Sequence, residues 1–142
     1  MRNTKEMVTQ KYINDIAYRV VGCAIEVHKN LGPGLLESVY QPCLVAELED
    51  AGLDVQTQLY VPVKYKNKDF GGILKLDLLV NDLIIIELKA VDLMIPLFKA
   101  QLLSYLKLAG KPKGLLINFH CENITDQVVP LVTEEFSRLP RS

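Results

Sequence analysis

The sequence predicts a mixed α/β (α+β) domain in which helices flank a central sheet, and the pattern of apolar residues carries this prediction. Apolar residues recur at helical spacing over residues 12–30, whereas residues 83–89 and 114–119 form short, almost continuous apolar runs. Such runs are typical of strands buried on both faces, so these two strands should occupy the centre of the sheet. A helix expected at 96–108 separates them, which favours a parallel pair joined by a crossover.

The other elements follow from stop signals and alternation along the chain. Gly32, Pro33 and Gly34 end the first helix. Pro42 lies either in the first turn of the second helix or at a kink within it. Pro62 indicates an edge position or an irregularity in the first strand. In chain order, the expected elements are helices at 12–30 and 35–51, strands at 55–64, 73–80 and 83–89, a helix at 96–108, a strand at 114–119 and an edge strand within 125–136. We expect a single domain over residues 1–142, with flexible ends at 1–11 and 137–142.

Composition narrows the function classes. The net charge of −1 excludes a basic field over the whole surface and counts against tight, non-specific nucleic-acid binding, although it allows a local basic patch. No window is long and apolar enough to span a bilayer, and the first residues lack the apolar core of a signal peptide, so we expect a cytoplasmic protein without membrane association. Cys23, Cys43 and Cys121 are too far apart in sequence for a Cys-x-x-Cys zinc site or a disulfide framework.

The stretch 75–89 combines an apolar hairpin with three charges: Asp77 in one strand, Glu87 and Lys89 in the other. Buried charges are costly unless they are paired or bind a metal. Glu87 and Lys89 are two residues apart, so they share a face. A two-residue turn would put Asp77 on the opposite face, whereas a three-residue turn would pair it with Glu87. Since Asn-Asp is not the Asn-Gly signal of a two-residue turn, we predict the three-residue connection.

Two converging carboxylates repel each other, and a divalent cation removes that conflict. Oxygen ligands favour Mg²⁺ or Mn²⁺, and Lys89 would orient or deprotonate a water or stabilise charge on a phosphate. This arrangement suits metal-assisted hydrolysis of a phosphodiester. The competing interpretation is a structural Asp–Lys or Glu–Lys ion pair without a metal, and the spacing alone leaves the two about equal.

Four further residues have both a functional and an ordinary interpretation. Gln101 and Tyr105 share a helix face and would point toward the site, although such a pair more often lies on a surface. For Glu37 the ordinary interpretation is a solvated residue on the second helix, since a single Glu in a helix usually faces solvent. His28 either packs at the end of the first helix, the more common role, or lies near Glu37 and contacts phosphate.

Several motifs in order give the chain a resemblance to a known family. The run Gly34-Leu-Leu-Glu37-Ser-Val-Tyr40 resembles the signature of the GxxExxY protein family, which is in turn similar to the PD-(D/E)XK nuclease superfamily. The resemblance extends over residues 12–133 and is also carried by the segments 26–34, 77–80, 87–91, 101–106 and 114–119.

The resemblance implies a restriction-endonuclease-like αβββαβ core with a mixed central sheet. It implies Asp77 and Glu87 as metal ligands, with Lys89 as the catalytic lysine. Glu37 would be an additional acidic residue, and Gln101 with Tyr105 a further motif of some branches.

Our leading hypothesis is a nuclease that depends on Mg²⁺ or Mn²⁺ and acts on nucleic acid, DNA rather than RNA. Its predicted residues are Lys89, Glu37, Asp77 and Glu87 for catalysis, with Asp77, Glu87 and Glu37 as metal ligands, and Gln101, Tyr105 and His28 for positioning the substrate. Lysines that lie on one rim of the site would contact phosphates, and the candidates are Lys64, Lys66, Lys68, Lys75, Lys107, Lys111 and Lys113. For most of them the simpler interpretation is a solvated surface charge. The alternatives are a catalytically inactive nucleic-acid- or partner-binding protein with the same fold, and a homodimer whose shared groove holds the substrate.

Overall fold

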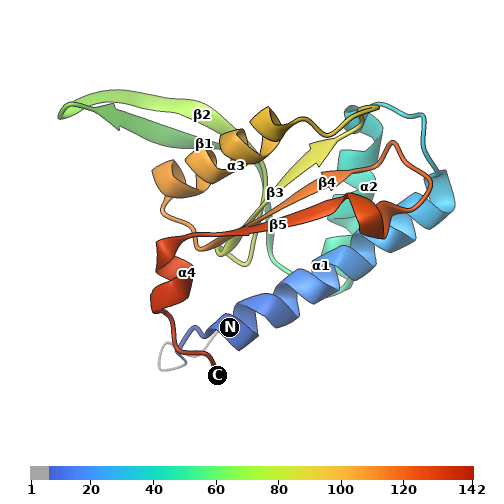
Figure 1. Cartoon of the computed structure of the whole chain (residues 1–142), viewed down its shortest axis with the longest axis horizontal. Helices are drawn as coiled ribbons and strands as arrows, with labels where there is room; N and C mark the ends of the chain where they lie inside the picture. Colours follow the sequence, from blue (N-terminus) through green and yellow to red (C-terminus); the bar gives the residue numbers. More distant parts are fainter. Residues whose placement is uncertain (1–6) are drawn as a thin grey trace.

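The computed structural model describes residues 7–142, which form a mixed five-stranded sheet with helices on both faces (Figure 1). In chain order the elements are α1 (Gln10–Leu31), α2 (Glu37–Asp50), β1 (Val55–Tyr65), β2 (Lys68–Val80), β3 (Ile84–Lys89), α3 (Pro96–Ala109), β4 (Lys113–Asn118), the 3₁₀ helix η1 (Ile124–Gln127), β5 (Val128–Val132) and α4 (Glu134–Arg138). Within this range no helix is both long and apolar enough to cross a bilayer.

The predicted fold class and the predicted centre of the sheet are confirmed. The strands lie in the order β1-β2-β3-β4-β5, so β3 occupies the middle. Strands β3 and β4 are parallel and joined through α3, while the other neighbouring pairs are antiparallel. Helix α3 begins at Pro96, whose fixed φ suits a first helical residue, and ends at Gly110 in the left-handed conformation.

Two apolar clusters hold the layers together, one on each face of the sheet. The first packs α1 and α2 against one face, and its sheet residues include Leu78, Ile84 and Ile86. The second packs α3 against the other face, through residues such as Leu102 and Ile85. A residue's cluster therefore shows which face of the sheet its side chain occupies.

The hairpin before the buried strands differs from the prediction. Strand β2 begins at Lys68, five residues earlier than expected, and the glycines at 71 and 72 lie within it. The turn is formed by Lys66 and Asn67, both with positive φ, which is the geometry of a tight two-residue hairpin. The two glycines form part of a β-bulge. Three residue steps of β2, from Gly72 to Asp69, lie opposite two residue steps of β1, from Pro62 to Lys64. Pro62 lies at this irregularity, on the edge strand, as predicted.

The helical boundaries and the ends differ in detail. Helix α2 begins at Glu37, and Pro42 is its sixth residue, where it removes an intrahelical hydrogen bond. The sequence did not predict η1 or α4. The backbone N–H groups of Gln10 and Lys11 donate to the carbonyls of residues 140 and 141, which ties the C-terminal segment to the start of α1. The flexibility expected at 137–142 stays a prediction, and residues 1–6 lie outside the described range.

Candidate active site

The turn between β2 and β3 has the predicted odd length. Val80 pairs with Ile84 across the three-residue turn 81–83, and Leu78 pairs with Ile86 at the last rung of the ladder. One step further in this register, Asp77 stands opposite Glu87. The prediction that a three-residue connection brings these two carboxylates together is confirmed.

Beyond the last rung, carboxylates take the place of backbone partners. The Asp77 N–H donates to Glu87 Oε1 at 3.4 Å, and the Leu88 N–H donates to Asp77 Oδ2 at 3.2 Å. Each acidic side chain thus accepts a hydrogen bond from the opposite strand's backbone. The two strands part at this point, and the carboxylates occupy the notch between them.

The notch holds more negative charge than its surroundings can accommodate. Glu87 is only 7% exposed. Burial first, and then the charge of Asp77, raise the pKa of Glu87 to about 8, although the nearby charge of Lys89 opposes the shift. At neutral pH the pair therefore retains a proton on Glu87. A cation bound between the carboxylates would displace that proton.

The alternation of side chains along β2 is interrupted next to Asp77. Leu76 and Leu79 both belong to the cluster on the α3 face, whereas Leu78 belongs to the cluster on the α1 face. Regular alternation would have placed residues 76 and 78 on the same face. Asp77 itself keeps the alternation of residues 78–80, which places its carboxylate on the α3 face with Glu87, and the side-chain direction shifts by one residue between Asp77 and Leu76.

The matching irregularity in β1 is Gln58, whose φ is +51°. Thr57 pairs with Leu78 and Leu59 with Leu76, so the β1–β2 register is the same on both sides and the missing rung is Gln58 opposite Asp77. A positive φ costs a residue with a Cβ about 1–2 kcal/mol and often marks a functional site. The strain at Gln58 thus lies directly opposite Asp77, where the alternation of β2 shifts.

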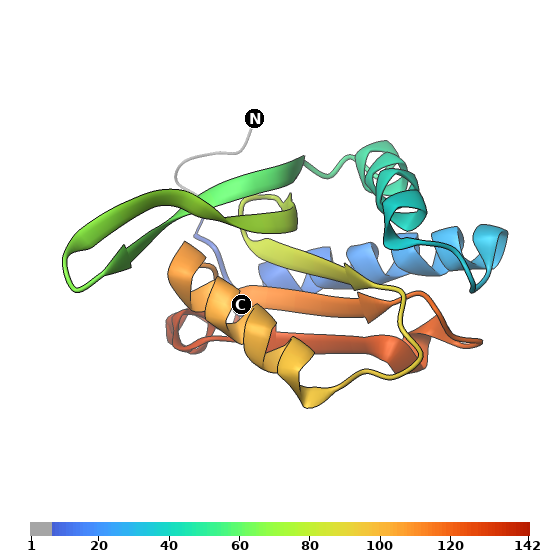
Figure 2. The same ribbon diagram turned by 90° about the horizontal axis from the view of Figure 1, so that it is seen from above.

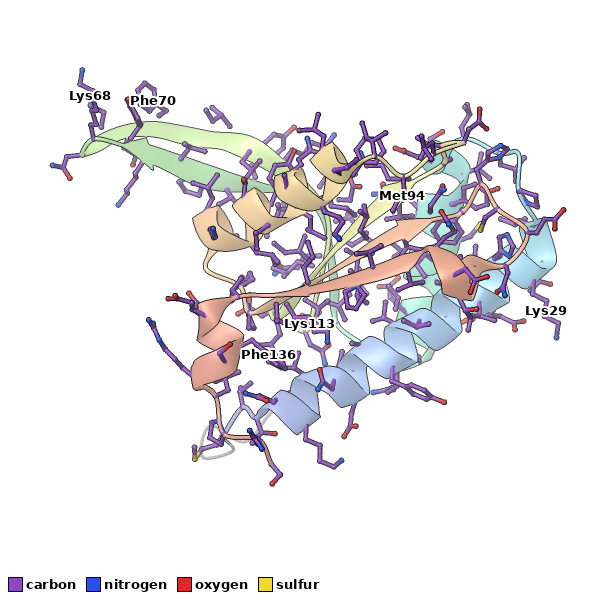
Figure 3. All side chains as sticks on the ribbon, in the orientation of Figure 1. Lys29, Lys68, Phe70, Met94, Lys113 and Phe136 are labelled. Carbon is purple, nitrogen blue, oxygen red and sulfur yellow. The ribbon has the colours of Figure 1, made fainter. Side chains whose placement is uncertain are left out.

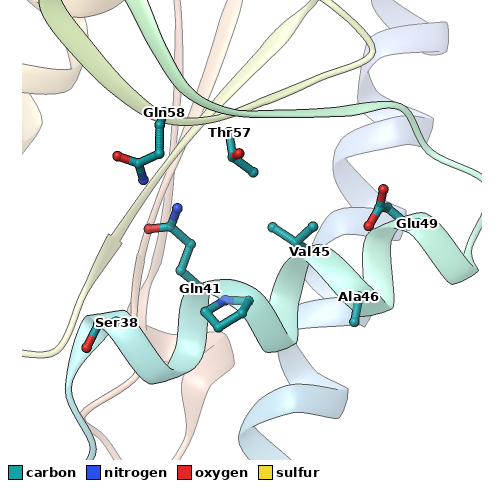
Figure 4. A pocket seen from close by; sticks show the side chains of 8 residues that line it. Ser38, Gln41, Val45, Ala46, Glu49, Thr57 and Gln58 are labelled. Atoms are coloured by element: carbon teal, nitrogen blue, oxygen red, sulfur yellow. The ribbon is translucent and has the colours of Figure 1, made fainter.

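A groove between β1 and α2 lies beside this irregularity (Figure 4). The amides of Gln41 and Gln58 point toward each other across it. Its volume is about 450 Å³, and one of its lining residues, Ser38, also lines a second hollow of about 380 Å³ with Leu36, Glu37 and Ala90. The two hollows therefore adjoin next to Glu37.

Lys89 and Tyr105 lie on the α3 side of the notch. The Lys89 ammonium lies 4.5 Å from the ring centroid of Phe98, a cation–π contact that holds the side chain. Within residues 7–142 the ammonium forms no ion pair. Burial, followed by the charges of Glu87 and Asp77, raises the pKa of Tyr105, as expected for a phenol near the two carboxylates. The side chain of Gln101, one turn earlier, is exposed and makes no hydrogen bond in the described part of the chain.

Glu37 lies at the mouth of the notch, at the carboxyl end of β3. Its Oε1 accepts a hydrogen bond from the Ala90 N–H at 3.3 Å. Tyr40 shapes the preceding loop: its buried hydroxyl donates to the Gly32 carbonyl at 2.6 Å and accepts from the Leu35 N–H at 3.2 Å. The aromatic residue of the Gly-x-x-Glu-x-x-Tyr run thus positions the acidic one.

The family comparison agrees with this geometry. A family model described as the PD-(D/E)XK nuclease superfamily matches residues 14–130. The chain belongs to the PD-(D/E)XK nuclease superfamily. Searches of curated proteins and of solved structures found no match. Nucleases of this superfamily generally use divalent metal ions, which makes the carboxylate notch the place to test for one.

The donors of this PD-(D/E)XK domain fit a magnesium-like ion with few protein ligands. Within residues 7–142 no three His, Cys, Asp or Glu side chains form a group that could hold a metal ion, so Glu37 does not converge with Asp77 and Glu87. Mg²⁺ commonly binds through one or two carboxylates and completes its shell with waters and substrate phosphate oxygens. The Asp77–Glu87 pair supplies that number of carboxylates, together with excess negative charge.

Asn118 supports the loop after β3, a role that our sequence reasoning missed. Its side chain accepts from the Val91 N–H at 3.1 Å and donates to the Val91 carbonyl at 2.9 Å. Asn118 is 1% exposed and pairs with Lys89 in the β3–β4 register. The signal was a polar residue at the end of an otherwise apolar strand, where a buried amide requires partners.

His28 has a structural partner away from the carboxylates. Its Nε2 lies 2.7 Å from the Cys121 carbonyl oxygen, which ties the end of α1 to the loop after β4. This bond supports the packing interpretation of His28. We therefore leave it out of the proposed substrate contacts.

Proposed function

We propose that this PD-(D/E)XK protein is a metal-dependent nuclease that hydrolyses phosphodiester bonds in nucleic acid. The observation that carries the proposal is the pair of buried Glu87 and half-buried Asp77 at the end of the β2–β3 ladder, with Lys89 on the same face. A structural Glu–Lys pair is less well supported, because Lys89 contacts Phe98 and forms no ion pair in residues 7–142.

Asp77 and Glu87 would hold Mg²⁺ or Mn²⁺, and Glu37, which does not converge with them, would act from the mouth of the notch as an additional acid outside the ion's ligands. A bound divalent ion supplies Lewis-acid stabilisation of the phosphate and an acidified water. Lys89 would stabilise the phosphate's developing charge or deprotonate the attacking water. Tyr105 and Gln101, on the adjacent face of α3, would position the nucleic acid.

The finer assignments belong to the same proposal. The Gly34–Tyr40 run supports membership of the GxxExxY family, because Tyr40 and Glu37 have distinct structural tasks in it. We propose DNA as the preferred polymer and a cytoplasmic location, which the three unpaired cysteines at 23, 43 and 121 support. A homodimer would enlarge the grip of a 142-residue domain.

Two measurements test the proposal. The first records thermal stability while Mg²⁺ or Mn²⁺ is titrated: the wild type and Lys89→Ala should be stabilised at millimolar metal, whereas Asp77→Asn and Glu87→Gln should lose the response. Glu134→Gln, an exposed carboxylate on α4, is the matched control and should respond like the wild type. Absence of a metal response in the wild type contradicts the site.

The second measurement is hydrolysis of single- and double-stranded DNA and RNA. The wild type should cut in the presence of metal, and Lys89→Ala should not cut although it still binds the ion. A wild type that binds metal and nucleic acid without cutting would establish the inactive binding protein instead.

A further inference from the structure

Strands β1 and β2 extend beyond the rest of the sheet as a two-stranded arm, which we define as residues 60–75 (Figures 1 and 2). The base of the arm is anchored, because Leu59, Val61 and Leu74 pack against the cluster under α3. Beyond the base, residues 64–73 are all exposed. The distal half therefore forms a ribbon with little support from the rest of the domain.

This ribbon exposes aromatic side chains. Tyr65 is 60% exposed and Phe70 is 50% exposed, on either side of the turn. An isolated two-stranded ribbon is marginally stable in water, and exposed rings on such an element indicate a surface that contacts a partner.

The arm is also the positively charged part of the chain. It carries four lysines (Lys64, Lys66, Lys68 and Lys75) and one aspartate, whereas the chain as a whole has 16 basic and 17 acidic residues. The aspartate, Asp69, accepts a local hydrogen bond from the Gly71 N–H. All remaining acidic side chains, 16 against 12 basic ones, lie outside the arm.

Lysines and rings alternate on the ribbon. The Lys66 ammonium lies 5.4 Å from the Tyr65 ring centroid, and Tyr65 pairs with Lys68 across the strands. Figure 3 shows Lys68 and Phe70 together at the end of the arm. Two other candidate lysines have partners elsewhere: Lys111 pairs with Asp82 and Lys113 with Asn14, each within 2.9 Å.

We propose that the arm binds single-stranded nucleic acid, with its lysines on phosphates and with Tyr65 and Phe70 stacked on bases. Basic groups interleaved with exposed aromatic rings are the combination that single strands require, since each unstacked base offers a face. A second copy of the chain is a poorer occupant of arm-to-arm contacts, because the lysines would repel each other. The identity of the polymer rests on the proposed nuclease function.

The arm is connected to the notch through β2. Asp77 follows Lys75 by two residues, and nine strand steps from Asp77 to Lys68 span roughly 30 Å. A single strand held along the arm would therefore lead to the carboxylates. The arm would contribute affinity at a distance from the reacting phosphate.

The test measures binding of a fluorescent single-stranded oligonucleotide by anisotropy in EDTA, so that no metal-dependent cutting interferes. Lys66→Glu/Lys68→Glu should weaken binding at least ten-fold and reduce its salt dependence, by about 0.7 in the log–log slope for each phosphate that a lysine no longer neutralises. The control Lys11→Glu/Lys29→Glu changes the net charge equally on α1, with Lys29 at the far end of the molecule, and should bind within about two-fold of the wild type.

The stacking part has its own matched pair. Tyr65→Ser/Phe70→Ser should weaken binding about five-fold or more for each base that loses its ring. The control Tyr18→Ser removes an 82% exposed ring from α1 and should have no effect. Thermal midpoints of all variants should stay close to the wild type, because every substituted side chain is exposed.

Equal losses in arm and control variants would overturn the proposal, as would unchanged binding in the arm variants. Tighter binding to duplex than to single strands, insensitive to the two rings, would also overturn it. Arm variants that lose self-association while they keep nucleic-acid binding would assign the arm to a second copy. If the wild type never cuts but the arm variants lose nucleic-acid binding, the arm proposal is supported and the nuclease proposal is refuted. If the arm variants bind and cut like the wild type, the nuclease proposal is supported and the arm proposal is refuted.

Discussion

Strand β2 takes part in two hairpins whose charges have opposite physical settings. With β3 it forms a buried hairpin, closed by a three-residue turn, in which two carboxylates share a notch. With β1 it forms the exposed arm, closed by a two-residue turn, in which lysines are solvated. Buried charges alter protonation and metal affinity, whereas exposed charges alter association and its dependence on salt.

The largest expected effect separates the two hairpins by their kinetics. Lys89→Ala should lower kcat about 10²–10⁴-fold if Lys89 has the role proposed above, on the reacting phosphate or its water. Lys75→Ala, on the arm, should raise KM several-fold with kcat nearly unchanged, because it contributes only to binding. Steady-state kinetics on an oligonucleotide would check this, with Lys29→Ala as the control. A kcat loss of similar size in both variants would contradict the division of roles.

The second prediction concerns pH and the metal-free protein. Because the pKa of Glu87 is raised from 4.5 to about 8, the folded state keeps a proton that the unfolded state loses. Stability should therefore fall as pH rises from about 4.5 to 8 and level off above that, by a few kcal/mol in total. Glu87→Gln should remove this fall and be more stable than the wild type at pH 9. Urea unfolding across pH would measure it.

Metal should reverse this pH effect in the wild type alone. Mg²⁺ or Mn²⁺ replaces the proton on Glu87, so stabilisation by metal should grow between pH 6 and pH 8.5. Glu134→Gln should behave like the wild type throughout, since its carboxylate is exposed. Metal stabilisation that does not change with pH would place the ion elsewhere.

The sequence was most informative where local rules decide structure. Apolar runs located β3 and β4, and the missing Asn-Gly signal predicted the turn length that sets Asp77 opposite Glu87. The predicted start of the second strand at residue 73 was wrong, because Gly71 and Gly72, which precede it, form part of a β-bulge inside the strand. Contacts between residues far apart in sequence were harder to predict. The packing of α2 against the sheet sets the position of Glu37, which contacts Ala90 and does not converge with the other carboxylates.

Gln58 shows another limit of the sequence, since nothing in a Gln between two strand residues signals a positive φ. It also offers a further prediction. Gln58→Gly should keep or raise stability by up to about 1 kcal/mol, because glycine adopts this conformation without strain. Gln58→Val should lower stability by about 1–2 kcal/mol, because a β-branched residue disfavours positive φ, and should reduce activity, because position 58 lies directly opposite Asp77. Thermal unfolding and the nuclease assay would check both. Equal stability of the two variants would contradict the strain at Gln58, and unchanged activity of Gln58→Val would contradict its link to Asp77.

The smallest expected effect tests the loop that presents Glu37. Tyr40→Phe preserves the stacking on Phe119, whose ring centroid lies 4.7 Å away, but removes the hydroxyl that bonds Gly32 and Leu35. Stability should fall by about 1 kcal/mol, because two partly buried backbone groups lose a partner. Activity should fall further than in the control Tyr18→Phe, because Glu37 would no longer be held at the mouth of the notch. Retained activity with reduced stability would show that Tyr40 supports only the fold, and that the acidic residue at the mouth needs no fixed loop beneath it.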